Sequence, residues 1–408
     1  MLKSKTLHFF SQLCYLDAVP AMDKGSGMTV ATMADYYLTE PLGMAYINNR
    51  FSDIPEESVL WSDFLETASP EFSEWLIEDI FDDNRPGQTG FYGCTYRSPE
   101  GESVVAFRGS ELLGNRYYKN DYVTDLALSY LSPTPQQARV DDYWARYGRT
   151  RYGELAVTGH SLGGNLALYA AIMAPARIRE QITICAAFNA PGFNKEFIEK
   201  QRDRVAAAAP CIVLYQNKFD PVSSMLDNVV PPAVIASRVD PTAQDEATIR
   251  DIFYPHSNFM YETDEYGELI ADPSEEKCSF CNMVHTLSDL FQLLPKKTRK
   301  DICDAALAAL YAAPSPEKRA RYMLDAVLKY MAHHEDEMRV SGLDSAVLAY
   351  AAAMMDGMPV HALYKPLVAG KGKGKTQAPS LVRALMIVIG MFGDLASGKK
   401  ALANTNIR

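Results

Sequence analysis

A short apolar run, a glycine-rich turn and a second apolar run occupy residues 155–170 and constrain the fold more than any other stretch. The first run, Leu155–Val157, has the apolar residues of a buried strand. The turn reads Gly159-x-Ser161-x-Gly163, and an Ala- and Leu-rich segment suited to a helix follows it. A strand that turns sharply into a helix is a building unit of α/β proteins, so the rest of the chain is expected to supply neighbouring strands.

The chemistry of serine explains the residue types in this turn. A serine hydroxyl is a weak nucleophile unless it is exposed, aimed and placed beside a base. A tight turn exposes Ser161 at the end of the strand, and glycines flank it because a Cβ there would meet the neighbouring strand and helix. The helix that follows directs its free N–H groups and positive dipole end at a developing oxyanion. These features predict the nucleophile elbow of an α/β-hydrolase.

Other segments fit a sheet built around the elbow. Strands are expected at 90–97, 103–108, 181–188 and 211–215, the first two as a hairpin and the last two as central parallel strands. Helices are expected at 28–38, from 55, and at 72–81, 120–131, 135–147 and 192–209. The pattern predicts a mostly parallel central sheet with helices on both faces, preceded by N-terminal helices and followed by a helical C-terminal region.

A nucleophile elbow requires an acid and then a histidine, in that order along the chain. Asp220 follows the expected strand 211–215 and is the candidate acid, which would orient the histidine and stabilise its charged form. Among the seven histidines, His160 adjoins the nucleophile and its side chain is expected to point elsewhere. His256, in a loop before a short expected β run at 257–261, and His285, at the start of an amphipathic helix, are the two candidate bases.

The oxyanion formed during acyl transfer needs two hydrogen-bond donors. One is the backbone N–H of the residue after the nucleophile, here Leu162. The other is expected from an earlier loop, and Ser110 follows the expected strand 103–108 directly after Gly109. Ser110 offers its N–H, and its hydroxyl is expected to act as a second donor.

These motifs resemble the landmarks of the class 3 lipases. Residues 105–110, 159–164 and 217–222 carry the resemblance, and residues 10–17 and 188–193 look more like a bacterial branch of lipase-like proteins of unknown function. The similarity covers roughly residues 7–310. It implies an α/β-hydrolase fold, ester hydrolysis, Ser161, Asp220 and His256 as catalytic triad, and Ser110 and Leu162 as oxyanion donors.

Two departures from the lipase pattern stand out. Ser110 occupies a position where the lipases usually have threonine, so a hydroxyl is retained. Asp220 precedes His256 by only 36 residues, short for the lipases, and precedes His285 by 65. In the bacterial branch a histidine followed by a short β run occupies the position of His256, and this resemblance favours His256 as the base.

Charge divides the 408-residue chain into two expected domains. Residues 296–408 hold 17 Lys and Arg against 10 Asp and Glu, whereas residues 1–295 hold 23 against 41. We therefore expect an α/β-hydrolase catalytic domain at 1–295, with N-terminal helices, and a basic helical region at 296–408. The acidic bulk argues against nucleic acid as a partner. The basic region suggests docking onto the acidic domain or peripheral contact with an anionic membrane surface, and the sequence leaves the oligomeric state open.

Cysteine usage favours a cytoplasmic protein. Seven cysteines, an odd number scattered through expected core elements, suit a reducing compartment. Cys278 and Cys281 form a single C-x-x-C pair with no second pair. His285 and Cys303 could complete a zinc site, but the sequence does not favour one. Residues 371–376 end in G-K-T but lack the preceding strand and the first glycine of a phosphate loop. No metal or organic cofactor is expected, and no apolar stretch is long enough to span a membrane.

The function expected from these features is hydrolysis of carboxylic esters, of small molecules or lipids, through an acyl-enzyme on Ser161. A thioesterase, peptidase or acyltransferase could use the same residues, and a non-catalytic binding protein could retain the fold. Residues 111–132 form a candidate lid, with a plain amphipathic helix packed on the sheet as the alternative.

Overall fold

The computed structural model describes residues 2–18, 28–50, 55–67, 69–85, 87–111, 118–148, 154–241 and 253–313, and a few short pieces between 322 and 334. The helices are α1 (Ser4–Leu13), α2 (Val30–Thr39), α3 (Pro41–Arg50), α4 (Pro55–Thr67), η2 (Ser69–Phe72), α5 (Tyr118–Ala127), α6 (Pro135–Tyr147), α7 (Leu162–Met173), α8 (Ala176–Arg179), α9 (Lys195–Lys200), α10 (Arg202–Ala208), η3 (Ala209–Cys211), η4 (Val222–Ser224), η6 (Tyr254–His256), η7 (Asn258–Met260), α12 (Ser279–Gln292) and α13 (Lys296–Ala312). The strands are β1 (Leu76–Asp83), β2 (Phe91–Arg97), β3 (Ser103–Phe107), β4 (Leu155–His160), β5 (Ile182–Phe188), β6 (Ile212–Asn217) and β7 (Ala233–Ile235).

The chain divides into two compact units. The first comprises residues 1–240 and 253–284, and the second comprises 241–252 and 285–408. In the described part of the second unit, α13 buries Ile302, Ala306 and Leu310. The expected boundary at residue 295 stays a prediction, and most of the expected helical region 296–408 lies outside the described residues.

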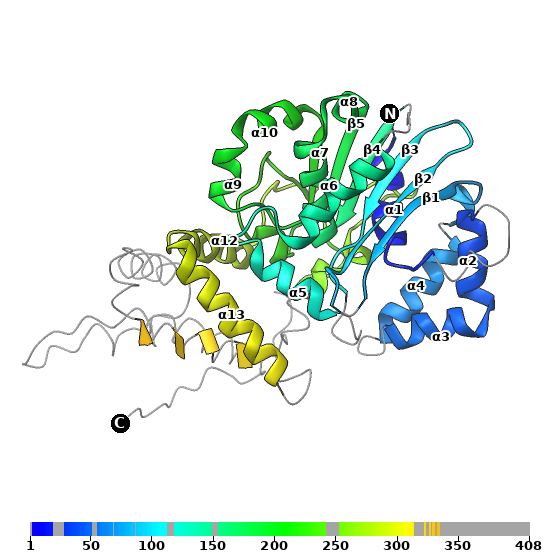
Figure 1. Ribbon diagram of the computed structural model, residues 1–408. Helices are drawn as coiled ribbons and strands as arrows, with labels where there is room; N and C mark the ends of the chain where they lie inside the picture. The colour runs from blue at the N-terminus through cyan, green and yellow to red at the C-terminus, as the bar shows by residue number, and fades with distance from the viewer. Residues whose placement is uncertain are drawn as a thin grey trace, which may run out of the picture. The chain divides into compact units, whose positions relative to one another are not determined.

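The first unit is built on a seven-stranded sheet with the strand order β1-β2-β3-β4-β5-β6-β7 (Figure 1). β1, β2 and β3 pair antiparallel, and β3 through β7 pair parallel. In register, Phe107 of β3 faces Gly159 of β4, and His160 faces Phe188 of β5. The carboxyl ends of β3, β4, β5 and β6 therefore meet at one edge of the sheet, where ligands bind in α/β folds.

Helices cover both faces of the sheet (Figure 1). Ala106 and Ala156 pack in one buried cluster with Leu7 and Phe10 of α1. Their neighbours Val105 and Val157 point to the other face and pack with Leu166 of α7 and Trp144 of α6. This alternation is the period-two pattern of strands covered on both faces. The arrangement confirms the predicted α/β-hydrolase fold class, including the N-terminal helices and helices in the C-terminal part.

One expected helix, 72–81, is wrong. The segment begins as the short helix η2 and then becomes β1, the antiparallel edge strand paired with β2. A bulge shifts the register between Glu78 and Phe81, with Asp79 at φ +52°. The bulge adds one residue between the pairs Glu78–Thr95 and Phe81–Gly93, so Ile77 packs on one face of the sheet and Phe81 on the other. The period-two alternation that marks a strand in sequence is therefore broken in this segment.

Other local expectations fare better. The β2–β3 hairpin forms with its turn at 98–101, where Gly101 adopts φ +92°. The expected helix 192–209 is divided at Gln201 into α9 and α10. Among the described residues, no helix is both long and apolar enough to cross a lipid bilayer.

Candidate active site

Ser161 lies in the sharp turn between β4 and α7. Its backbone has φ +59° and ψ −129°, a conformation that is strained for a residue with a side chain. Its N–H donates to the carbonyl of Phe188 on β5 (2.9 Å), and its own carbonyl accepts from the N–H of Gly164 (2.9 Å). A Cβ at Gly163 would overlap the carbonyl oxygen of Phe107 on β3, and a Cβ at Gly159 would overlap the carbonyl oxygen of Gly163 in α7. The flanking glycines thus allow the close packing that the elbow requires.

The side chain of His256 meets the hydroxyl of Ser161. His256 Nε2 lies 2.8 Å from Ser161 Oγ, and its side chain is 21% exposed. The residue ends the short helix η6, which Pro255 helps to form, and η7 follows it. The short β run expected at 257–261 is therefore wrong, and only Tyr261 forms an isolated bridge, with Ser237. The turn formed by η6 and η7, and not a strand, therefore places the His256 side chain beside Ser161.

Asp220 lies on the other side of the His256 ring. Its Oδ1 accepts a hydrogen bond from His256 Nδ1 (3.0 Å) and from the N–H of Val222 (2.9 Å), and its Oδ2 accepts from the N–H of Ser223 (3.0 Å). Burial acts to raise the pKa of this fully buried carboxyl, but His256, Lys277 and the hydrogen bond from Ser223 hold the pKa well below its usual range. Asp220 is therefore ionised at neutral pH and holds Nδ1 as the protonated nitrogen, which leaves Nε2 to accept the hydroxyl proton of Ser161.

A partly buried lysine supports the turn that carries Asp220. Lys277 Nζ donates to the carbonyls of Asn217 (2.8 Å) and Asp220 (2.7 Å) and to Ser223 Oγ (2.8 Å). Sequence reasoning missed Lys277, because its distance of 57 positions from Asp220 leaves no local signal.

Two side chains hold the backbone of His256. Its carbonyl oxygen lies 2.7 Å from His160 Nε2 and accepts from Asn189 Nδ2 (3.2 Å). Burial and the nearby His256 lower the pKa of His160 to about 3, so the ring is neutral at pH 7. Since a carbonyl only accepts, His160 carries its proton on Nε2, and Nδ1 accepts from the hydroxyl of Tyr15 (2.9 Å). His160 therefore points away from the Ser161 hydroxyl, as expected, but it supports the base.

The alternative base, His285, lies in another setting. It is part of α12, in the second unit, where its Nε2 is 3.7 Å from a carboxylate oxygen of Asp289 and its side chain is 47% exposed. Among the described residues no group of three or more His, Cys, Asp or Glu side chains is arranged to hold a metal ion. The structure thus brings His256, and not His285, to Ser161 and Asp220.

The candidate oxyanion donors lie at the ends of β3 and β4. Leu162 begins α7, and the first N–H groups of a helix have no partner within it. Gly109 passes close to the elbow. A Cβ at this position would overlap the hydroxyl of Tyr15 and the carbonyl of His160, so only glycine allows this approach. The next residue, Ser110, donates its hydroxyl to Asp125 Oδ2 of α5 (2.7 Å). The hydroxyl hydrogen expected to serve the oxyanion is therefore engaged by Asp125, and the backbone N–H of Ser110 stays the candidate donor.

The candidate lid has one described helix, α5. Burial raises the pKa of Asp125 in this helix to about 6, whereas Ser110 and the charge of His256 act to lower it. Leu128 is buried just after α5 and packs against Leu162 and Leu226. Part of the segment, 112–117, lies outside the described residues, and the role of 111–132 as a lid stays a prediction.

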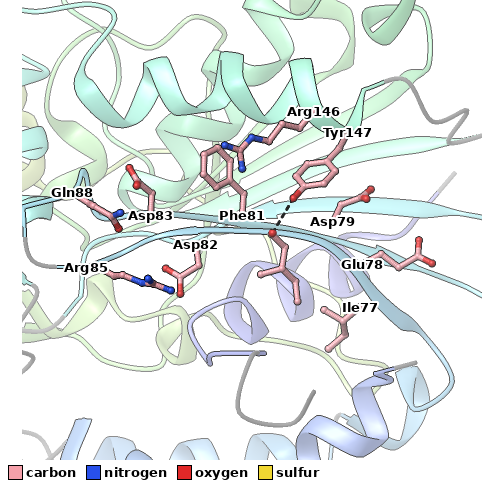
Figure 2. Close-up of a pocket in the computed structure, with 11 residues that line it drawn as sticks. Ile77, Glu78, Asp79, Phe81, Asp82, Asp83, Arg85, Gln88, Arg146 and Tyr147 are labelled. Atoms are coloured by element: carbon pink, nitrogen blue, oxygen red, sulfur yellow. Dashed lines mark hydrogen bonds between the residues drawn. The ribbon is translucent and has the colours of Figure 1, made fainter. Parts of the chain in front are cut away.

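A separate cavity of about 640 Å³ lies along the edge strand β1 (Figure 2). Arg146 stacks over the ring of Phe81, 4.2 Å from its centroid, and the hydroxyl of Tyr147 donates to the carbonyl of Ile80 (3.0 Å). Carboxylates and arginines dominate the lining, which includes none of Ser161, Asp220 and His256. Such a charged lining is unsuited to an acyl chain, so we place no substrate there.

The family of the chain follows from residues 68–306, which match the model of the Mbeg1-like family. The chain is a member of the Mbeg1-like family. The matched region runs from η2 into α13 and includes Ser161, Asp220 and His256. No curated protein matches this Mbeg1-like chain.

Several solved lipases are similar in structure to this Mbeg1-like protein. The extracellular lipase LipA from Serratia marcescens is 14% identical with a TM-score of 0.38, over 62% of this chain and 49% of the lipase. A triacylglycerol lipase from Penicillium expansum is 17% identical with a TM-score of 0.28, over 40% and 71% of the two chains. A lipase from Rhizopus microsporus var. chinensis is 19% identical with a TM-score of 0.30, over 55% and 82%. The chain spans about half the length of the Serratia lipase.

Proposed function

We propose that the protein is a serine hydrolase that cleaves carboxylic esters through an acyl-enzyme on Ser161. The observation that carries this proposal is the hydrogen-bonded series of Ser161 Oγ, His256 and Asp220 at the strained turn after β4. A hydroxyl 2.8 Å from an imidazole that is held by a buried carboxylate can lose its proton as it attacks a carbonyl carbon.

The proposed reaction proceeds in two halves. His256 takes the Ser161 proton during attack, Asp220 stabilises the resulting imidazolium, and the N–H groups of Leu162 and Ser110 bind the oxyanion. His256 then gives the proton to the leaving alcohol, and the acyl group remains on Ser161. Water, activated by His256 in the same way, releases the acid and restores the enzyme.

We expect the substrate to carry an acyl chain, because apolar side chains gather next to Ser161. Leu128, Leu162 and Leu226 form a buried apolar cluster that begins directly after the nucleophile. Apolar side chains beside an oxyanion donor suit the acyl portion of an ester, which includes lipid esters. Contact of the basic region 296–408 with an anionic membrane surface and a cytoplasmic location remain predictions.

A fluorophosphonate probe tests the proposal, because it phosphonylates an activated serine. We expect the wild type to carry the label on Ser161 and the variant Ser161→Ala, folded by circular dichroism, to carry none. Turnover of p-nitrophenyl esters should fall by about 10⁶-fold in Ser161→Ala. A label on another residue, or a variant with a tenth of wild-type turnover, would contradict the proposal.

The same preparation separates the alternative functions. A series of p-nitrophenyl esters from acetate to palmitate would give the preferred acyl length. Thioester and peptide substrates would identify a thioesterase or peptidase, and transfer to an added alcohol in preference to water would identify an acyltransferase. A protein that is neither labelled nor active would be a binding protein with a hydrolase fold.

A further inference from the structure

Two cysteine thiols lie side by side next to the turn that carries Asp220. Cys278 directly precedes Ser279, the first residue of α12, and Cys281 is the third residue of that helix. Their sulfur atoms are 3.3 Å apart, and neither cysteine is in a disulfide. Positions three apart at the start of a helix are close enough for a disulfide, which needs the two sulfurs about 2.05 Å apart. The candidate hydrolytic mechanism uses neither thiol.

The two thiols differ in reactivity. Cys278 is partly exposed, and its sulfur accepts from the N–H of Cys281 (3.4 Å) at the positive end of the helix. Hydrogen bonding from Cys281 and the charge of Lys277 lower the pKa of Cys278 to about 6, against the effect of burial. Cys281 is buried, and both its hydrogen bond to Cys278 and its burial raise its pKa. Cys278 is thus suited to attack an external disulfide as a thiolate. Cys281, which is buried beside it, is suited to attack the resulting mixed disulfide at Cys278.

We propose that Cys278 and Cys281 are a redox-active dithiol that a small-molecule disulfide, such as oxidised glutathione, converts into an intramolecular disulfide. The Cys278 thiolate attacks one glutathione sulfur, a mixed disulfide forms, and glutathione leaves as a thiolate. Cys281 then loses its proton and attacks Cys278 Sγ, which releases the second glutathione. The protein loses two electrons and two protons, and one glutathione disulfide becomes two thiols.

The state of the dithiol bears on the turn at 217–224 in two ways. The carbonyl of Lys218 accepts from the N–H of Cys278 (3.1 Å) and lies 3.7 Å from Cys281 Sγ. Burial lowers the pKa of Lys277, while the charges of Asp220 and both cysteines oppose this shift. In a disulfide, Cys281 has no S–H to offer to Cys278 or to the Lys218 carbonyl, and no negative charge remains to hold Lys277 as a cation. Oxidation therefore weakens the support that Lys277 and Lys218 give to the Asp220 turn.

Thiol counting on the full-length protein tests the site. After treatment with oxidised glutathione and alkylation under denaturing conditions, the wild type should have five reactive thiols in place of seven and retain no glutathione. Reduced glutathione should restore all seven. Cys281→Ser should trap one glutathione on Cys278, and Cys278→Ser should trap none on Cys281. The control Cys211→Ser removes another partly exposed thiol and should still close the disulfide. A wild type that keeps all seven thiols, or a Cys281→Ser variant that takes up no glutathione, would overturn the proposal.

Hydrogen exchange tests the link to the Asp220 turn without requiring activity. Residues 217–224 should exchange faster in the oxidised wild type than in the reduced protein, and Cys278→Ser should not respond to the oxidant. Equal exchange in both redox states would overturn the link. The consequence for catalysis rests on the proposed function: the oxidised protein should hydrolyse p-nitrophenyl butyrate about 3- to 10-fold more slowly, since small displacements of catalytic groups are costly. An equal rate in both states would overturn this consequence. If neither form hydrolyses the ester, the proposed function fails, while thiol counting and exchange still decide the redox site.

Discussion

The proposed nucleophile, Ser161, and its two proposed partners, His256 and Asp220, are held by different kinds of interaction. Ser161 takes its position from the turn between β4 and α7, whose backbone bonds join its carbonyl to the N–H groups of Gly164 and Asn165. His256 and Asp220 are held by hydrogen bonds from residues 96 and 57 positions away, His160 and Lys277. The elbow turn is therefore encoded mainly by neighbouring residues, with added contacts to Phe188 of β5 and Phe107 of β3, whereas the proposed acid–base pair comes together only once the sheet has assembled. Substitutions of His256, of Asp220 and of the residues that hold them should show how much activity depends on the reacting groups and how much on their positions.

His256 should give the largest effect among the residues held by long-range contacts. His256→Ala removes the proton acceptor of Ser161, so ester turnover should fall by about 10⁶-fold, as for loss of the nucleophile. The matched control His285→Ala should keep turnover within about two-fold, because surface changes away from the chemistry have small effects. Steady-state rates on p-nitrophenyl butyrate measure both. The opposite result would move the base to α12.

Asp220 should give the next effect. Asp220→Asn keeps the shape but no longer favours the productive tautomer of His256, so kcat should fall by about 10⁴-fold. Because the pKa of Asp220 in the fold lies below its unfolded value of about 3.9, its ionised form stabilises the protein above that pH. This stability is lost as the pH falls below about 4, so urea unfolding of the wild type should weaken more steeply on acidification than that of Asp220→Asn. Parallel pH profiles would argue against the native carboxylate assignment.

Substitution of His160 should show how much activity depends on the position of the His256 ring alone. His160→Phe keeps a ring but removes the hydrogen bond to the His256 carbonyl, and kcat should fall by about 10- to 100-fold while fluorophosphonate still labels Ser161. Tyr15→Phe removes only the hydroxyl on the far side of His160 and should cost less. Rates and labelling kinetics of the two variants measure the difference. A His160→Phe variant as active as wild type would show that Asn189 alone holds His256.

Ser110 should give the smallest effect. If its backbone N–H is the oxyanion donor, Ser110→Ala keeps that donor and should lower kcat by less than about 10-fold, whereas loss of an oxyanion donor costs about 10²- to 10³-fold. Asp125→Asn provides the comparison, because it changes the acceptor of the Ser110 hydroxyl and leaves the backbone intact. A loss of 100-fold or more in Ser110→Ala, measured as kcat on the same ester, would assign the role to the hydroxyl.

The sequence by itself determined the fold class and the position of Ser161. The elbow could be predicted because a buried strand, two glycines and an apolar helix lie next to one another along the chain. The packing of Gly159 against Gly163 follows from that local geometry, whereas Gly163 packs against Phe107 of β3. Asp220 could be named because it follows a central strand. The choice of His256 over His285 used its loop position before 257–261 and the resemblance to lipase-like proteins, whereas the spacing from Asp220 favoured His285.

The tertiary structure decided what surrounds these residues. The bulge at Asp79 breaks the alternation of buried side chains in β1, and only pairing with β2 made this segment a strand. His160 and Lys277 donate to backbone carbonyls far away in sequence. Every residue has a backbone carbonyl, so no sequence pattern shows which one accepts. The hydroxyl of Ser110 donates to Asp125 because α5 packs there, which the sequence of either segment does not encode alone. Neighbouring residues determine local backbone geometry, but hydrogen bonds between distant segments form only when the sheet brings those segments together.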